Sequence, residues 1–473
     1  MRSLSNRLLL KALLHVIAVQ YNQRRKLRKL LRHADGWFHF TVGFRTEDDG
    51  VGAGLVFADG RVKVRNRLPE APDVTLVFRD PDAIGEMLSS APNEVLNLLL
   101  RGRLRVEGNF SFLQAFNFFL SRTLGRFQRR LETRRRDRVH RERLDFAGTI
   151  RPTRRRVAER RGRLRAERVD PGVKLLDEPY LVHLGLDDLP RLRRFRDAHF
   201  TTRPELCDER ARILTEHFRD RGFERDPDGL PRVPVLRQAE AFSHLMRSRQ
   251  PIVRDGDLLA GTTTAKKVGV VLYPDAHGTL IWGELDALPD RELNPYDVSA
   301  ETLQTLHHDV FPFWTRRNFR ERVRHRHHAP RCQALDERFA LYFVWKSVAL
   351  SHTVPDFEKL LTQGTTGILA EIDAALASAE PGKHSALHAM ATCLRGLEHY
   401  ADALSNRAEA ESKQASEEGR RRELERIAAI CRHVPRNPAR TLHEAVQSVW
   451  ICWVGMHMEN TNAGLSLGRL DQW

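Results

Sequence analysis

The alternation of apolar and polar residues between positions 34 and 123 indicates a small α+β domain. Three β-rich runs, at residues 37–42, 54–57 and 74–78, fit strands with at least one buried face. Residues 58–61 (Ala-Asp-Gly-Arg) predict a hairpin turn directly after the second run. A helix is expected to open at Asp82, because an aspartate suits a helix N-terminus.

From about residue 169 onward the periodicity becomes helical. Apolar residues recur three and four positions apart over residues 209–218, 239–247, 298–306, 339–351 and 442–458, and a β-like run at residues 267–273 interrupts them. Pro204 is expected to start a further helix, whose positive end Glu205 and Asp208 would complement. The pattern as a whole predicts a mixed α/β fold that is mainly helical.

The first 33 residues read as a basic amphipathic helix that packs on the following domain. Their leucine-rich run follows Arg2 and Arg7, but Lys11 interrupts it and no small-residue cleavage site follows, as a signal peptide would require. The run is also too short to span a bilayer. Association with a membrane surface is the alternative interpretation.

Positive charge is concentrated in the middle of the chain. The sequence holds 78 Lys and Arg against 62 Asp and Glu, a net charge of +16, and arginine is densest between Arg126 and Arg168. Residues 124–168 are therefore expected to form an Arg-rich connector, helical or partly ordered. Nucleic-acid binding is the disfavoured alternative, because few aromatic residues interleave the arginines.

The positions of the cysteines and histidines do not predict a metal site. The five cysteines are scattered and contain no CxxC pair, which argues against a disulfide framework or a zinc ribbon and favours a reducing cytoplasm. His307, His308 and the histidines of residues 325–328 lie among arginines, which repel cations, and no regularly spaced acidic ligands accompany them.

Residues 104–110 (Leu-Arg-Val-Glu-Gly-Asn-Phe), followed by the apolar residues 112–120, resemble the end of a sterol carrier protein type domain. The resemblance covers roughly residues 34–123. It implies a strand and a turn that lead into a helix over an apolar tunnel, and therefore a hydrophobic or acyl ligand. The alternative is a small α+β domain whose apolar stripe is ordinary core.

Several fragments in a fixed order resemble the glycyl radical enzymes of the pyruvate formate-lyase superfamily. They are residues 202–211 (TRPELCDERA), 234–242 (PVLRQAEAF), 251–261 (PIVRDGDLLAG), 311–314 (FPFW), 351–357 (SHTVPDF), 438–447 (PARTLHEAVQ) and a terminal motif of Ser466, Gly468, Arg469, Asp471 and Gln472. Asp257 departs mildly from the family, which usually has glutamate there. Each fragment is weak alone, but together they span about 270 residues.

The resemblance implies the first half of the family's α/β barrel over residues 169–473, incomplete at its C-terminus. In the family, an S-adenosylmethionine radical activating enzyme installs a glycyl radical, which passes to an active-site cysteine. Neither the cysteine loop nor the glycine loop can be matched here, so we expect no catalytic residue and no directly bound cofactor in this chain. The implied partners are the activating enzyme, a complementing C-terminal chain and, because the family is commonly dimeric, a second subunit.

Two residues are candidates for a substrate pocket. His352 and Asp356 lie four positions apart, and a helix would place both on one face. Pro355 indicates that the helix begins near it instead, which leaves an ordinary capping or turn pair as the alternative. The terminal motif residues are expected to brace the half-barrel, and Cys452 is expected to be core.

These expectations lead to two hypotheses. The first is the N-terminal part of a glycyl radical enzyme of formate acetyltransferase, lyase or dehydratase type, inactive alone. The second is a non-catalytic lipid- or acyl-binding protein that keeps a truncated radical-enzyme scaffold.

Overall fold

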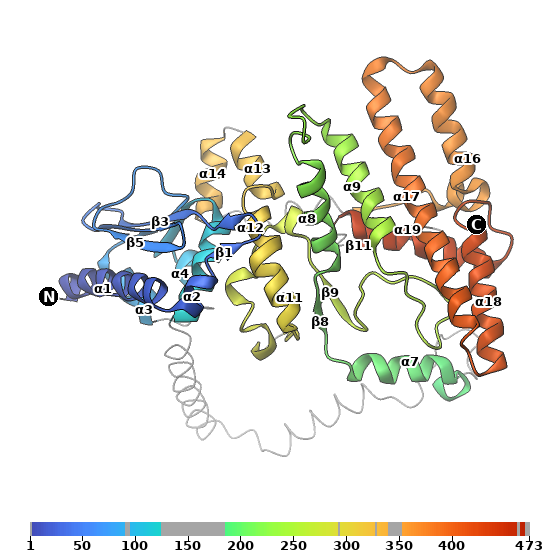
Figure 1. The fold of residues 1–473 in the computed structure, drawn as a ribbon, viewed down its shortest axis with the longest axis horizontal. Helices are drawn as coiled ribbons and strands as arrows, with labels where there is room; N and C mark the ends of the chain where they lie inside the picture. Colours follow the sequence, from blue (N-terminus) through green and yellow to red (C-terminus); the bar gives the residue numbers. More distant parts are fainter. Residues whose placement is uncertain are drawn as a thin grey trace.

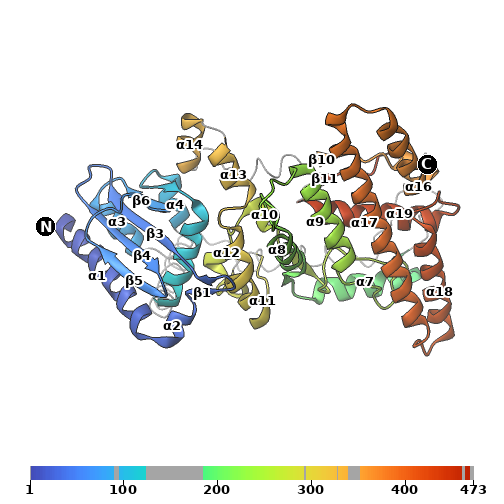
Figure 2. The same ribbon diagram turned by 45° about the horizontal axis from the view of Figure 1, so that its top comes forward.

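The computed structural model describes residues 2–89, 95–123, 185–291, 294–326, 329–338, 352–460 and 464–468. It contains a sheet domain at the N-terminal end and a mainly helical region beside it (Figures 1 and 2). The Arg-rich connector expected at residues 124–168 and the helix expected at residues 339–351 lie outside the described residues.

The sheet domain is built on five strands in the order β5-β4-β3-β6-β7. These are β3 (Phe40–Thr46), β4 (Gly52–Ala58), β5 (Arg61–Arg65), β6 (Val74–Phe78) and β7 (Leu104–Gly108). Strands β3 and β6 are parallel, and the other neighbours are antiparallel. The predicted hairpin turn is confirmed between β4 and β5, where Asp59 and Gly60 have φ of 53° and 67°.

Helices cover this sheet. They are α1 (Arg2–Gln23), α2 (Arg25–Lys29), α3 (Pro81–Ser89), α4 (Val95–Leu100) and a helix over residues 110–123. The helix expected at Asp82 is thus present as α3. The N-terminal segment forms two helices rather than one, followed by the short strands β1 (Arg32–His33) and β2 (Gly36–Trp37). Asn22 at the end of α1 bonds both the N–H and the C=O of Val62 on the edge strand β5.

Aromatic rings fill the space between the sheet and the helix over residues 110–123. The Phe40 ring lies 4.2 Å from Phe57 and 5.8 Å from both Phe112 and Phe119, and all four side chains are at most 2% exposed. Such stacked rings bury a large apolar area. Core packing therefore accounts for these helix side chains without a ligand.

The sheet domain and the helical region share one hydrophobic core. At the junction the buried His307 ring stacks on Phe118 at 4.1 Å. Its Nδ1 accepts a hydrogen bond from Trp282 Nε1 at 3.0 Å, so Nε2 carries the proton and donates to the Leu30 carbonyl at 2.8 Å. Burial lowers the pKa of His307 to about 3, which keeps the ring neutral. The two parts are therefore packed as one body at this face.

The first half of the helical region runs from residue 185 to residue 338. Its elements are α7 (Pro190–Thr201), β8 (Glu205–Cys207), α8 (Glu209–Arg221), α9 (Pro234–Ser248), β9 (Gly269–Val271), α10 (Pro274–His277), α11 (Ala300–Thr305), α12 (Phe311–Trp314), α13 (Phe319–Arg326) and α14 (Pro330–Glu337). A π-helical turn over Leu306–Val310 joins α11 to α12.

The prediction that a helix starts at Pro204 is wrong. Glu205–Cys207 forms the strand β8, which pairs in parallel with β9, and the helix α8 begins only at Glu209. Leu206 and Cys207 are buried in this pairing, so long-range backbone hydrogen bonds override the local helix signal.

The second half consists of long helices and one short strand pair. They are α16 (Phe357–Ser378), α17 (Pro381–Ser412), α18 (Glu418–His433) and α19 (Leu442–Glu459), with β10 (His352–Thr353) parallel to β11 (Gly464–Leu465). Helix α17 packs along α9 and α18 (Figure 1). The helices expected at residues 209–218, 239–247 and 442–458 are confirmed as α8, α9 and α19, and α11 falls within the one expected at residues 298–306.

Candidate functional site

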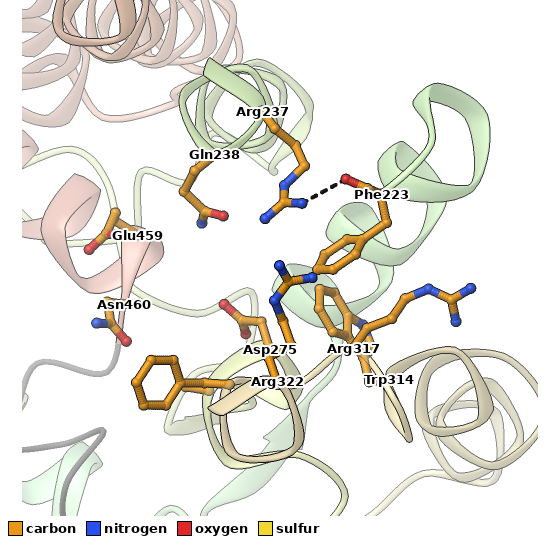
Figure 3. A pocket seen from close by; sticks show the side chains of 11 residues that line it. Phe223, Arg237, Gln238, Asp275, Trp314, Arg317, Arg322, Glu459 and Asn460 are labelled. Atoms are coloured by element: carbon orange, nitrogen blue, oxygen red, sulfur yellow. Dashed lines mark hydrogen bonds between the residues drawn. The ribbon is translucent and has the colours of Figure 1, made fainter. Parts of the chain in front are cut away.

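A cavity of about 240 Å³, with both apolar and charged side chains in its lining, lies among α9, α10, α12, α13 and the end of α19. Its walls come from Phe223, Arg237, Gln238, Asp275, Ala276, Trp314, Arg317, Phe319, Arg322, Glu459 and Asn460 (Figure 3). Segments more than 200 positions apart in the sequence thus meet around one space.

Arg237 supplies the cationic wall of this cavity. Its guanidinium lies 4.3 Å above the Phe223 ring, and Nη1 donates to the Phe223 carbonyl at 2.7 Å. The Nε atom is buried and has no hydrogen-bond partner among the described residues. Burial, with the neighbouring charges of Arg322 and Arg232, lowers the pKa of Arg237 to about 10. Arg237 is therefore a cation that an anionic group would stabilise.

Arg322 adds a second positive charge beside the first. Its guanidinium lies 5.1 Å from the same Phe223 ring, and its Nη1 pairs with Glu224 at 2.8 Å. In Figure 3 the guanidinium of Arg322 points into the cavity, toward Arg237, whereas that of Arg317 points away. Two arginines from different helices, α9 and α13, thus point their guanidinium groups toward one another in the cavity (Figure 3).

Two acidic residues, Asp275 and Glu459, also line the cavity. Asp275 receives two hydrogen bonds from the buried Arg210, at 2.7 and 2.9 Å, so its charge is already matched. Glu459 is an exposed residue, yet the packing around its carboxyl raises the pKa, an effect that the Arg210 charge opposes. A carboxyl group with a raised pKa can exchange a proton with a ligand. The cavity therefore holds both basic and acidic side chains.

The two predicted pocket residues lie elsewhere. His352 is in β10, where its backbone pairs with Gly464, and Asp356 caps α16, with its Oδ1 accepting from Lys359 N–H at 3.0 Å. The helix begins after Pro355, at Phe357, so His352 and Asp356 do not share a helix face. Neither residue lines the cavity described above. Their role in a substrate pocket stays a prediction.

The terminal motif is only partly described. Ser466 N–H donates to the Thr353 carbonyl at 3.1 Å and so extends the pairing of β10 with β11. Gly468 has a φ of +71°, which favours glycine. Arg469, Asp471 and Gln472 lie outside the described residues.

The described residues contain no cluster of possible metal ligands. No group of three His, Cys, Asp or Glu side chains there could hold a metal ion. Cys452 contributes to the core, as expected, and burial raises its pKa to about 12. Within the same residues, no helix is both long enough and apolar enough to cross a membrane.

Sequence reasoning missed the cavity residues. Arg237 and Gln238 fall inside the quoted fragment 234–242, but nothing in the spacing distinguished them from structural positions. Asp275 and Glu459 carried no signal, because the fold alone joins α10 to the end of α19.

The fold is a mainly helical region with a cavity that is lined by both arginine and carboxylate side chains. Residues 186–473 match the sequence profile of the family described as "Pyruvate formate lyase-like". The chain belongs to this family.

Curated relatives are enzymes of the lyase and dehydratase type. The chain is 30% identical over 287 residues to the isethionate sulfite-lyase of Nitratidesulfovibrio vulgaris, covering 58% of this chain and 34% of that protein. It is 24% identical over 290 residues to the trans-4-hydroxy-L-proline dehydratase of Clostridioides difficile, covering 60% and 36%. The chain thus spans about a third of the length of the curated relatives it matches.

Solved structures support the same fold. A Roseburia inulinivorans structure concerned with 1,2-propanediol dehydration aligns with a TM-score of 0.54 and 25% identity, over 60% of this chain and 33% of that one. The glycerol-bound, B12-independent glycerol dehydratase of Clostridium butyricum aligns with a TM-score of 0.54 and 23% identity, over 60% and 36%.

Proposed function

We propose that this chain forms a substrate-binding part of a glycyl radical enzyme of the lyase or dehydratase type. The observation that carries the proposal is the cavity with Arg237 on one wall and Glu459 on the other, inside the region that matches the family. Family members are activated by S-adenosylmethionine radical enzymes, which makes such an enzyme the first expected partner. A polypeptide that supplies the cysteine and glycine loops is the second.

The proposed substrate is a small molecule with an anionic group and a hydroxyl or other leaving group. Arg237 and Arg322 would hold the anionic group, because charge-assisted hydrogen bonds from guanidinium are strong in a partly dry site. Glu459 would exchange a proton near the leaving group. The names of the relatives point the same way: one releases sulfite from isethionate, and another dehydrates hydroxyproline.

Ligand binding by the purified chain tests the pocket directly. We expect calorimetry with isethionate or trans-4-hydroxy-L-proline to detect binding, and Arg237→Gln to weaken it by at least about tenfold, since a hydrogen bond to a charged group contributes about 1.5–3 kcal/mol. Arg247→Gln, an exposed arginine on the same helix, is the control and should bind normally. Equal weakening by both variants, or no effect of Arg237→Gln, would contradict the assignment of the cavity.

The radical chemistry needs a separate experiment. The chain is incubated anaerobically with an activating enzyme and S-adenosylmethionine, first alone and then with a family polypeptide that carries the cysteine and glycine loops. We expect an electron paramagnetic resonance signal of a glycyl radical, and product formation, only in the mixture. Product formation that is independent of the chain would refute its role in the enzyme.

A further inference from the structure

Helix α1 has two apolar faces. One is buried against the sheet domain through Leu10, Leu14, Ile17 and Tyr21, each at most 1% exposed. The other faces solvent: Leu8, Leu9, Val16 and Val19 are 63%, 50%, 45% and 48% exposed.

These four exposed residues form one stripe. At 3.6 residues per turn they fall, together with the exposed Ala12, within a sector about 100° wide, opposite the buried face. Single exposed apolar residues are ordinary on a protein surface, whereas a continuous stripe marks an interaction site. We call these five residues the α1 stripe. In Figures 1 and 2, α1 lies at the outer end of the molecule, away from the helical region. The rest of the described chain therefore leaves the α1 stripe exposed.

The surroundings of the α1 stripe are strongly basic. The first 33 residues contain no Asp or Glu but hold nine basic side chains: Arg2, Arg7, Lys11, Arg24, Arg25, Lys26, Arg28, Lys29 and Arg32. The neighbouring edge strand β5 adds the exposed Arg61, Lys63 and Arg65. Acidic groups are few around it: Asp82 accepts from Asn6 and Asp48 lies beside Arg7 at the start of the helix, and Asp286 lies near Tyr21 at its other end.

We propose that the α1 stripe docks the protein peripherally on an anionic lipid surface. A helix with an apolar face and a basic surround settles at the boundary of headgroups and acyl chains, where both features are satisfied. Each nearby Lys or Arg strengthens the attraction to anionic headgroups. The inference is independent of the radical chemistry, since it uses only the sheet domain.

Charge and apolar surface argue against two other binding partners of the α1 stripe, a second copy of this chain and a nucleic acid. A second copy of α1 would set nine cations against nine others, which repel. A nucleic acid would engage the basic residues but would leave Leu8, Leu9 and Val16 exposed, because phosphates offer them no apolar contact. A lipid surface satisfies the charge and the apolar stripe together.

Vesicle flotation with the full chain tests the proposal. We expect binding to vesicles of phosphatidylserine and phosphatidylcholine, and at least about tenfold weaker binding to phosphatidylcholine alone or at high salt, because anionic lipid and screening control the electrostatic part. The double variant Leu8→Asp/Val16→Asp should lose about tenfold or more in partition to the anionic vesicles. The matched control is Leu230→Asp/Val235→Asp, whose side chains are exposed to a similar degree, 63% and 43%, but lie in the helical region. It should bind as the unmodified chain does.

Three results would overturn the proposal. They are an absence of binding to anionic vesicles, binding that Leu8→Asp/Val16→Asp leaves unchanged, and a dimer in light scattering that this variant dissociates. Circular dichroism checks that both variants keep the helical content of the unmodified chain. Since the altered residues are exposed, we expect no loss of fold. Because the readout is lipid binding, failure here leaves the pocket proposal untouched.

Discussion

Arg210 holds together three segments that frame the cavity. Its guanidinium is 2% exposed, donates to Asp275 at 2.7 and 2.9 Å, and lies 4.4 Å from the Tyr273 ring. It also donates to the carbonyls of Met458 and Glu459, at 2.7 and 2.9 Å. One side chain of α8 therefore fixes α10 and the C-terminal end of α19.

Replacing Arg210 by methionine should destabilise the protein strongly. The change keeps the apolar stem but leaves the carboxylate of Asp275, only 20% exposed, without its cation, and leaves two carbonyls without a donor. Breaking a buried ion pair from one side costs about 3–5 kcal/mol, most of it from the uncompensated charge. We therefore expect a loss of about 3–5 kcal/mol in the free energy of unfolding. In the unmodified protein the Arg210 charge opposes the rise in the pKa of Glu459 that burial causes. Its loss in the variant should therefore raise the pKa of Glu459 further.

Arg212→Met is the matched control on the same helix. Arg212 pairs with Glu216 one turn away at 3.1 Å, but both side chains are more than 40% exposed. Exposed pairs of this spacing contribute only about 0.3–0.5 kcal/mol. The two substitutions remove the same chemical group, but only Arg210 is buried and bonded to Asp275 and to two backbone carbonyls.

Urea titrations followed by circular dichroism and by tryptophan fluorescence measure the difference. Coincident transitions are required before a free energy is assigned. A loss below about 1 kcal/mol for Arg210→Met, or a loss equal to that of Arg212→Met, would refute the reasoning. As a further check, the double variant Arg210→Met/Asp275→Leu should recover part of the stability, because no unpaired charge remains.

Two further predictions concern a glycine and the domain junction. Gly364→Ala should destabilise by more than about 1–2 kcal/mol, because φ is +67° and the added Cβ would lie 2.3 Å from the Arg436 carbonyl oxygen; Gly382→Ala, with no atom within 4 Å, is its neutral control in the same urea assay. The buried His307 has its pKa lowered to about 3, so as the pH falls from about 6.5 toward 3 the unfolded chain takes up a proton that the folded ring does not, and stability falls by up to about 1.4 kcal/mol per pH unit. His307→Gln should show a shallower fall of the urea midpoint between about pH 7 and pH 5, and an unchanged slope would count against this origin of the pH dependence.

Several helices could be predicted because a helix that buries one face repeats apolar residues every three or four positions. The apolar stripes of α8, α9 and α19 are the faces they bury, so periodicity located them to within a few residues. The same logic failed at Pro204, where backbone pairing of Glu205–Cys207 with residues more than 60 positions away decides the structure. The β-like run at residues 267–273 marked one partner of this pairing, but nothing near Pro204 marked the other.

The cavity could not be predicted for a related reason. Arg237 looks like many other arginines in a chain with 78 Lys and Arg. What sets it apart is its Nε atom, which the fold buries without a partner among the described residues, and the carboxylates that α10 and α19 bring to the same cavity. Ordered motif fragments identify a family, whereas these side-chain properties arise only from packing.

The sheet domain is coupled to the cavity through the segment that joins α12 to α13. Asn109 donates to the Thr315 carbonyl at 2.8 Å, and Asn318 donates to Ser111 Oγ at 3.3 Å. Arg317 of that segment lines the cavity, together with Trp314 at the end of α12 and Phe319 at the start of α13. A ligand that orders this wall must therefore also stabilise the junction with the sheet domain, since binding to the folded state raises its stability. The sheet domain thus contacts, through Asn109 and Ser111, the same stretch of chain that forms part of the cavity wall.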